Sequence, residues 1–394
     1  RSGLRVIAVA AKKIEPSGIW GKNLSTSAIK EIISGLSLAG LVGLKDPIRE
    51  DVKDFLAMSR RAGIRTVMVT GDHIFTAKTV AREVGLTPKN RAQAEAIEGK
   101  DIDSLDAKEL AHRVRNVDIF ARVTPAQKLK ITEAWHSQGE LVAVVGDGVN
   151  DAPALRQADV GVALASGVDL SREASDLILL DNNFSVLVKA VREGRVILEN
   201  IKKIIAYLLS TSLTEIILVA LSLFFGLPIA VTAVQILWVN LVQESLPAIA
   251  LAMDPAEAEV MDVPPRSPRR PALDAFTVFL VAAIGLVSAA ALFLMFVFFK
   301  ESFGSVGYAR SVVFVGLGVS AILFTFSIRS LSKPIWEIRF FENRQLVGSA
   351  AAGFALLAAA VYWPPLQLLL KSQPIGFLEW VVVFGVGILN VLLV

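Results

Sequence analysis

Two aspartates, Asp147 and Asp151, follow a run of apolar residues (141–145) and flank the short segment Gly148-Val149-Asn150. A buried strand that ends in such a loop is suited to Mg2+, which binds oxygen and is usually held by one or two carboxylates together with phosphate and water. Glycine lets the backbone turn tightly and approach a phosphate. The sequence therefore predicts a Mg2+ site at Asp147, supported by Asp151. The alternative is a surface turn with two acids.

Two upstream segments carry groups that suit phosphate. Thr70-Gly71-Asp72 offers a hydroxyl and an unobstructed N–H, and Lys128 falls in the first turn of a helix predicted after Thr124-Pro125. Positioning and charge neutralisation do most of the work in phosphoryl transfer. Taken singly, Lys128 is an ordinary surface lysine and Thr70-Gly71-Asp72 a plain turn; the ordered combination predicts a phosphoryl-transfer site. Its predicted catalytic residues are Thr70, Gly71, Asp72, Lys128, Asn150 and Asp151, of which Thr70, Gly71 and Lys128 bind phosphate.

Short apolar runs alternate with amphipathic stretches before about residue 200, which predicts a parallel α/β sheet. Ligands bind at the carboxyl ends of the strands in such a sheet. The polar segments at Thr70, Thr124 and Asp147 follow three of these strands, so we expect them to lie together. The predicted strands are residues 38–42, 66–70, 117–120, 141–145, 160–163 and 177–180. Predicted helices open at Asp46-Pro47 and span residues 75–84 and 125–136, and residues 88–110 are expected to form a surface excursion.

Beyond about residue 200 the chain runs in long uncharged blocks, and 54% of its 394 residues are hydrophobic. These blocks predict six membrane helices, at residues 204–225, 231–253, 276–299, 311–328, 346–363 and 377–394. Basic residues concentrate in alternate loops, which predicts that the first part of the chain is cytosolic. Those loops contain Arg266, Arg269, Arg270, Arg329, Lys333, Arg339 and Arg344, against Lys300, Arg310 and Lys371 in the others. A net charge of +3 gives no indication of a nucleic-acid partner, and the absence of cysteine excludes disulfides and thiolate metal sites.

Two carboxylates, Glu215 and Glu244, fall inside the first two predicted spans. A carboxylate in a membrane is costly and indicates an ion or proton pathway. Asn240 and Gln243 share a helical face with Glu244, and Pro247 is expected to loosen that helix and free carbonyl groups. The sequence predicts one cation site formed by Glu215, Asn240, Gln243 and Glu244, with Ser212 at its edge. The alternative is that the acids lie near the interface or pair within the bundle.

The combined pattern resembles the P-type cation-transporting ATPases. In the first part, the segments are Asp46-Pro47-Ile48-Arg49, residues 68–73, 121–128 and 146–155, and Asp181-Asn182-Asn183-Phe184. In the spans, the resemblance is to type II calcium pumps and lies in Tyr207-Leu208-Leu209-Ser210, Trp238-Val239-Asn240-Leu241-Val242 and residues 261–266. It implies a haloacid-dehalogenase-like phosphorylation domain, use of ATP and Mg2+, an aspartyl-phosphate intermediate and transport of a cation.

Calcium is the leading cation by this resemblance, because large flexible oxygen cages suit it. The sequence departs from the family at the ion site. Ser212 replaces the usual Asn, Gln243-Glu244 replaces Thr-Asp, and residues 311–328 lack the carboxylate of a two-calcium pump. One transported calcium is therefore expected rather than two.

The family's phosphorylated Asp-Lys-Thr-Gly-Thr motif and its Thr-Gly-Glu motif are absent from these 394 residues. In the family both lie upstream, so we expect the C-terminal part of a pump whose partners are the upstream remainder and the lipid bilayer. The expected domains are residues 1–36 (tail of the nucleotide-binding domain), 37–200 (phosphorylation domain) and 201–394 (membrane domain), and a helix over residues 185–205 would link the last two. A plasma-membrane location is expected. The competing interpretations are a membrane-tethered phosphatase, a catalytically inactive regulatory protein and a passive channel or structural bundle.

Overall fold

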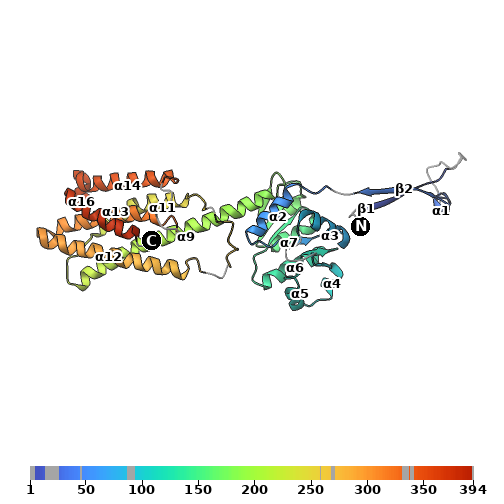
Figure 1. Ribbon diagram of the computed structural model, residues 1–394, viewed down its shortest axis with the longest axis horizontal. Coiled ribbons are helices and arrows are strands. Elements are labelled where there is room, and N and C mark those ends of the chain that lie inside the picture. The colour runs from blue at the N-terminus through green and yellow to red at the C-terminus, as the bar shows by residue number, and fades with distance from the viewer. Residues whose placement is uncertain are drawn as a thin grey trace. The chain divides into compact units, whose positions relative to one another are not determined.

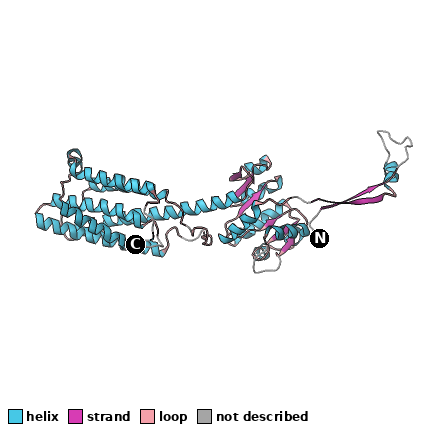
Figure 2. Ribbon diagram, turned by 45° about the horizontal axis from the view of Figure 1, so that its top comes forward, coloured by secondary structure: helices cyan, strands magenta, loops and turns pink. Residues whose placement is uncertain are grey.

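The computed structural model describes residues 5–13, 26–44, 47–86, 94–257, 259–267, 271–330, 337 and 341–392. The chain divides into two compact units, each considered by itself below. The first contains Arg1–Ala190 and Met261–Pro268, and the second contains Val191–Val260 and Arg269–Val394. All strands of the described residues belong to the first unit, and the second is helical (Figure 2).

Two parallel sheets form the centre of the first unit, where the alternating pattern predicted a single parallel sheet. One has the strand order β3 (Met68–Val69), β5 (Ile119–Ala121), β4 (Ala96–Glu98). The other has the order β6 (Ala143–Gly146), β7 (Val160–Leu164), β8 (Leu177–Leu179). Every strand pair in both sheets is parallel. The helices between them are α2 (Asp51–Arg61), α3 (Ile74–Val84), α4 (Gly99–Asp103), α5 (Ala107–Arg113), α6 (Pro125–Ser137), α7 (Ala152–Gln157) and α8 (Asp169–Glu173), with a 3-10 turn η1 (Val149–Asp151) (Figure 1).

The strand predicted over residues 38–42 exists, but it belongs to neither parallel sheet. It is β2 (Ser37–Leu44), which pairs antiparallel with β1 (Arg5–Ala11), and α1 (Thr26–Ile33) precedes it. The side chains of Leu38 and Leu41 are each 66% exposed. An apolar run predicts a strand but does not specify its neighbour, which explains this error.

The surface excursion predicted over residues 88–110 is wrong for the described residues 94–110. They contain β4, α4 and the start of α5, and they bury Ile97, Ile102 and Leu110 in the core. Elements of three, five and seven residues are too short to produce a recognisable periodicity. The helix expected to open at Asp46-Pro47 begins only at Asp51, and Asp46 lies outside the described residues.

The second unit is a helical bundle (Figure 1). Its first helix is α9 (Ser185–Phe224), which begins in the first unit, is continuous over 40 residues and merges the predicted linking helix with the first predicted span. The others are α10 (Ala233–Trp238), the π-helical segment η2 (Val239–Glu244), α11 (Ser245–Ala252), α12 (Ala275–Phe303), α13 (Val306–Ser327), α14 (Arg344–Tyr362), α15 (Pro364–Leu370) and α16 (Phe377–Leu392). Among the described residues, five helical segments are long and apolar enough to cross a membrane. The sixth predicted span corresponds to the shorter α16, so six spans are not established.

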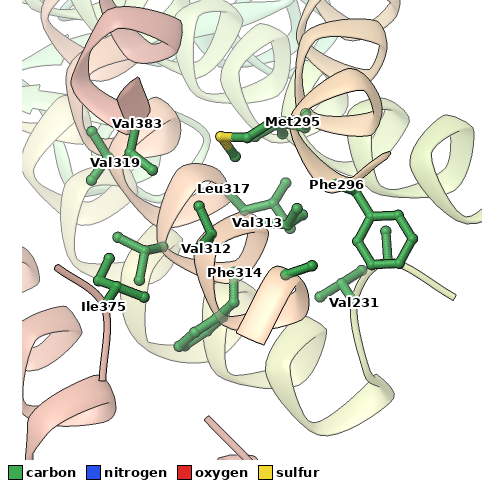
Figure 3. Close-up of a cluster of buried hydrophobic side chains, with 14 of the residues drawn as sticks. Val231, Met295, Phe296, Val312, Val313, Phe314, Leu317, Val319, Ile375 and Val383 are labelled. Atoms are coloured by element: carbon green, nitrogen blue, oxygen red, sulfur yellow. The ribbon is translucent and has the colours of Figure 1, made fainter. Parts of the chain in front are cut away.

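Helix α13 lies at the centre of this bundle. It is apolar on all sides, which is typical of a helix surrounded by other helices, and its residues Val312, Val313 and Phe314 are fully buried. Figure 3 shows these side chains packed with residues of neighbouring segments, including Met295 of α12 and Val383 of α16. The buried interior of the second unit therefore forms around α13.

Candidate phosphate and cation sites

The loop after β6 holds the two predicted metal-binding aspartates. Asp147 is exposed, and its backbone carbonyl accepts a hydrogen bond of 3.0 Å from the N–H of Val168. The carboxylate of Asp151 turns back to accept the N–H of Gly148 at 3.2 Å. A Cβ at Gly146 would lie 2.5 Å from the Cβ of Asp151, so only glycine fits there. The loop thus fixes Asp151 and leaves the Asp147 carboxylate open to solvent.

Lys128 forms an ion pair with Asp151. It lies in the first turn of α6, whose N-terminus is capped reciprocally by Thr124 and Gln127, with Pro125 at the first helical position. The side chains of Lys128 and Asp151 are 18% and 15% exposed, so the pair is largely shielded from water. The structure therefore brings Lys128 to the Asp147–Asp151 loop.

The α6 cap is also tied to α4. The side-chain amide of Gln127 donates to the carbonyl of Gly99 at 2.9 Å and to the Asp103 carboxylate. The pKa of Asp103 lies below its ordinary value because its carboxylate accepts side-chain hydrogen bonds. The hydrogen bond from Lys130 has the larger effect, and the one from Gln127 the smaller. Sequence reasoning missed Gln127, although its place three residues after Thr124 is the signature of a capping box.

Thr70-Gly71-Asp72 is joined to the residues just before α6. The N–H of Val123 donates to the carbonyl of Thr70 at 3.1 Å, and the N–H of Arg122 donates to the carbonyl of Asp72 at 2.9 Å. Arg122 has a left-handed backbone with φ of 52°, a conformation that a non-glycine residue adopts only where the surroundings hold it. A continuous series of contacts therefore runs from Thr70 through Arg122 and Val123 to α6, and from Lys128 to Asp151.

The exposed groups of this site are suited to an anion and its metal. The hydroxyl oxygen of Thr70 accepts the N–H of Asp72 at 3.1 Å, which leaves its proton free to donate. Gly71 and Asn150 are exposed, and no atom lies within 4 Å of where a Cβ of Gly71 would stand. Within the described part of the chain, no three acidic or histidine side chains gather into a metal cluster. Asp147 therefore fits Mg2+ only in the mode that uses few carboxylates and completes the shell with phosphate and water.

Two residues that sequence reasoning missed support the Asp147 loop. The hydroxyl of Ser171, which is fully buried, donates to the carbonyl of Gly148 at 2.7 Å. A Cβ at Gly167 would stand 3.1 Å from the backbone of Asp147. Both residues lie about twenty positions after the loop, and no local pattern links them to it.

Two further segments that resemble the P-type family also meet. The Arg49 guanidinium donates to the carbonyl of Asn182 at 3.0 Å and lies over the Phe184 ring, 5.7 Å from its centroid. The Asp51 carboxylate accepts the N–H of Phe184. These contacts join the chain at the start of α2 to the chain just before α9.

In the second unit, the predicted cation site lies where the second span becomes π-helical. Segment η2 covers Val239–Glu244 and ends three residues before Pro247. A proline lacks an N–H and displaces the carbonyl one turn earlier, which accounts for the widened turn, and π-helical turns are frequent at functional sites. The helix is loosened beside Pro247, as predicted.

The structure brings together Glu215 and Asn240. The Asn240 amide donates to Glu215 Oε2 at 3.2 Å, while Glu215 Oε1 is buried without a hydrogen-bond partner. Glu244, 3% exposed, interacts electrostatically with Glu215, and its Oε1 is likewise unpartnered. Buried carboxylates without compensating charge are unfavourable, and this favours a bound cation or proton.

The remaining members of the predicted site lie differently. Gln243 is fully buried and its amide donates to the carbonyl of Gly353 on α14 at 3.3 Å, with its Oε1 unpartnered. The π-helical turn has a longer period than an α-helix, so the shared face expected for Asn240 and Gln243 is lost. Ser212 is half-buried one turn before Glu215, and within the described residues it makes no hydrogen bond to the other four.

Comparison with known proteins gives matches in both units. Residues 18–159 match the family model of haloacid dehalogenase-like hydrolases, and residues 228–394 match that of the cation-transporting ATPase C-terminus. A calcium-transporting ATPase of Bacillus subtilis is 37% identical over 386 residues, which cover 98% of this chain and 42% of the relative. Calcium-transporting ATPase type 2C member 2 of Homo sapiens is 35% identical, over 89% of this chain and 37% of the relative.

Calcium-transporting ATPase 1 of Saccharomyces cerevisiae is also 35% identical, over 95% of this chain and 39% of its own length. The chain thus spans about two-fifths of the length of these relatives. The similarity runs through the haloacid dehalogenase-like unit and on through the apolar helices, in agreement with the motifs and with the fold. The chain belongs to the family of P-type cation-transporting ATPases.

Proposed function

We propose that this chain is the C-terminal part of an ATP-driven P-type pump that transports calcium across a membrane. The observation that carries this proposal is that a phosphate-type loop site and a buried pair of carboxylates in apolar helices occur in one chain. Relatives named calcium-transporting ATPases match this chain over nearly its whole length. The phosphorylated aspartate and the rest of the nucleotide-binding domain belong to the upstream remainder of the protein.

In the first unit, Asp147 would hold Mg2+ together with the phosphate, and Asp151 would position Lys128. The ion neutralises charge on the transferred phosphoryl group. Lys128, the Thr70 hydroxyl, the Gly71 N–H and the Asn150 amide would supply donors to its oxygens, and Asp72 would hold the Thr70 turn through the carbonyl contact to Arg122. The largely shielded Lys128–Asp151 pair supports these roles, because it fixes the ammonium group before substrate binds.

In the second unit, Glu215, Asn240 and Glu244 would bind the transported cation, with Gln243 and Ser212 completing the shell. Two carboxylates and side-chain amides suit calcium, which accepts flexible cages of oxygen ligands. The free Oε1 atoms of Glu215, Gln243 and Glu244 support this assignment. Turning Gln243 from Gly353 toward the site would be part of ion binding.

A membrane-tethered phosphatase or an inactive regulatory protein is the second interpretation. Neither requires acidic side chains inside the apolar helices, so the buried Glu215 and Glu244 favour the pump. We place the haloacid dehalogenase-like unit in the cytosol, on the basis of the basic loop residues, and we retain the expected plasma-membrane location. We retain the expected division of the chain at residues 36 and 200.

The test uses the full-length protein that contains this chain. Asp147→Ala is expected to reduce Mg2+-dependent phosphoenzyme formation from ATP by roughly 100-fold or more, because a metal ion supplies several kcal/mol of charge stabilisation. The measurement is acid-stable incorporation of label from γ-labelled ATP. Glu140→Ala, which removes an exposed acid of the same unit, is the control and should leave labelling unchanged.

Wild-type phosphoenzyme in Asp147→Ala would contradict the Mg2+ assignment. The 394 residues by themselves are expected to incorporate no label, since they contain no Asp-Lys-Thr-Gly-Thr segment. Labelling of this chain alone would contradict the proposal that the nucleophile lies upstream.

A further inference from the structure

The side chain of Gln243 makes its hydrogen bond to α14 rather than to another predicted ligand. Its amide nitrogen, Nε2, donates to the carbonyl of Gly353 at 3.3 Å, and the residue is fully buried. Asn240, three residues earlier on the same π-helical segment, donates instead to Glu215 of α9. Residues of η2 that the sequence assigns to one cation site are therefore divided between two helices, and Gly353 is the residue that holds Gln243.

Gly353 is a position where α14 and η2 approach each other closely. A Cβ atom at this position would lie 3.2 Å from Oε1 of Gln243 and 3.0 Å from Cδ1 of Ile322 on α13. Carbon atoms in contact are ordinarily about 3.5–4.0 Å apart, so an alanine here would have to move one of these side chains. A Cβ at Gly348, also on α14, would meet no atom within 4 Å. The lack of a side chain at Gly353 is thus what allows Gln243 to lie against α14.

The hydrogen bond between Gln243 and Gly353 satisfies only one end of the amide. Its length of 3.3 Å exceeds the roughly 2.7–3.2 Å of ordinary N–H···O bonds. Oε1 of Gln243, the atom that a cation would need, has no hydrogen-bond partner, and a buried acceptor without a partner is costly. Leaving Gly353 for a cation would reverse this arrangement, because the oxygen would gain a ligand and the nitrogen would lose a long hydrogen bond.

We propose that Gly353 is a positioning residue that sets the affinity of the cation site. Its carbonyl holds the Gln243 amide while the site is empty, and the cation has to displace this contact to gain Oε1 as a ligand. The proposal rests on the proposed function, since it takes Gln243 to be a ligand of the transported cation. When the binding-competent conformation is only partly populated, the apparent affinity is reduced by that fraction. Weakening the contact with Gly353 should therefore tighten cation binding, whereas loss of a purely structural contact gives no gain in affinity.

The experiment measures cation binding through thermal unfolding of the purified full-length protein in detergent, without any need for ATPase activity. The unfolding temperature is followed against CaCl2, MgCl2, MnCl2 and NaCl at constant ionic strength, because a ligand that binds the folded state stabilises it by mass action. The apparent affinity for the ion that stabilises the wild type most is then compared among variants. Gly353→Ala is expected to raise this affinity roughly 3- to 10-fold, the range that corresponds to one neutral hydrogen bond.

Gly348→Ala is the matched control, because it makes the same change on α14 at a position where the added Cβ meets no neighbour, and it should keep the wild-type affinity. Gln243→Ala should weaken binding. Gly353→Ala added to Gln243→Ala should cause no further change, since no amide remains to be released. This dependence on Gln243 is a readout that a change in packing alone would not give.

A second pair of variants covers the case in which Gly353→Ala alone does not fold. Ile322→Val removes Cδ1, the atom nearest to the new methyl group, so Gly353→Ala combined with Ile322→Val is compared with Ile322→Val alone. An affinity that is unchanged or weaker with Gly353→Ala, or that rises equally in the Gln243→Ala background, would overturn this inference and leave the proposed function standing. Failure of all four ions to stabilise the wild type would overturn both.

Discussion

Asp254 and the pair Glu215 and Glu244 are all buried in the second unit, but only Asp254 has basic partners. Its carboxylate accepts from Arg329 Nε at 2.8 Å and lies 3.5 Å from Lys203 Nζ. By contrast, Glu215 accepts from the amide of Asn240 and Glu244 from the hydroxyl of Thr211, and the two carboxylates interact with each other. The first arrangement supplies its own counter-charge, and the second leaves that to a ligand.

The position of each group explains the difference. Asp254 lies just after α11, where Asn343, the N-cap of α14, also donates to its Oδ1 at 3.0 Å. Lys203 of α9 further contacts Glu257 at 3.4 Å. This network ties helix ends together, which is a structural task. Glu215 and Glu244 lie within the spans, where an uncompensated acid indicates a pathway for ions.

Removing Asp254 should have the largest effect on stability. Asp254→Ala leaves Lys203 and Arg329 buried beside fewer negative charges, and breaking a buried pair by removing one member costs about 3–5 kcal/mol. Thermal unfolding of the purified protein should shift to much lower temperature. The matched control is Glu215→Gln, which removes a buried charge that has no basic partner and should not reduce stability.

If Asp254→Ala and Glu215→Gln destabilise the protein equally, the distinction between a structural and a ligand-binding carboxylate fails. A loss of stability confined to Asp254→Ala would sharpen it.

Glu215→Gln and Glu244→Gln should affect ion dependence instead. Loss of one charged ligand removes about 1.5–3 kcal/mol, so the apparent calcium affinity of the full-length ATPase should fall roughly 10- to 100-fold. ATPase activity is titrated with calcium, sodium, magnesium and manganese. Glu379→Gln, at a buried acid in the first turn of α16, is the control and should retain wild-type dependence.

Wild-type ion dependence in both variants would place the transport site elsewhere. If calcium alone fails to stimulate the wild type, the site stands and the ion assignment is wrong.

The smallest expected effect on stability is at Asp274, a solvent-exposed acid. Asp274 caps α12, and hydrogen bonds from Lys202 and then from Thr277 hold its pKa far below the ordinary value. Because the folded-state pKa is lowered, this stabilisation is complete above the unfolded-state pKa, near 3.9, and is lost as pH falls below it. Asp274→Asn keeps the cap but loses the ion pair with Lys202, which at a half-exposed site is worth about 0.5 kcal/mol.

The stability difference between Asp274→Asn and the wild type should therefore be complete at pH 7 and smaller at pH 3, where the unfolded state has begun to bind the proton and the folded state has not. Chemical unfolding at both pH values measures it. A difference that is the same at both would mean that the ion pair contributes nothing.

Local sequence was sufficient for much of the first unit. The apolar runs before Thr70, Thr124 and Asp147 predicted parallel strands, and each of these strands is present, although β6 before Asp147 is partly exposed. Parallel pairing of β3 with β5 brings together the polar segments that follow these two strands. The contact of Lys128 with Asp151 does not follow from that pairing, because Lys128 comes after β5 of one sheet and Asp151 after β6 of the other. Two predictions for this unit were wrong. The pairing of β2 was not predicted, because a run of apolar residues does not specify an antiparallel partner, and a surface excursion was predicted where the short elements β4, α4 and α5 lie.

In the second unit the sequence located the buried acids, because charge inside an apolar block is visible without a structure. It did not show that Gln243 turns toward α14, since the π-helical turn arises from Pro247 together with packing. Nor did it indicate the hydrogen bond from Ser288 of α12 to Asn390 of α16. Hydropathy determines which segments are helical and buried, whereas the facing of side chains on separate helices depends on packing between residues far apart in the chain, and only the tertiary structure decides it.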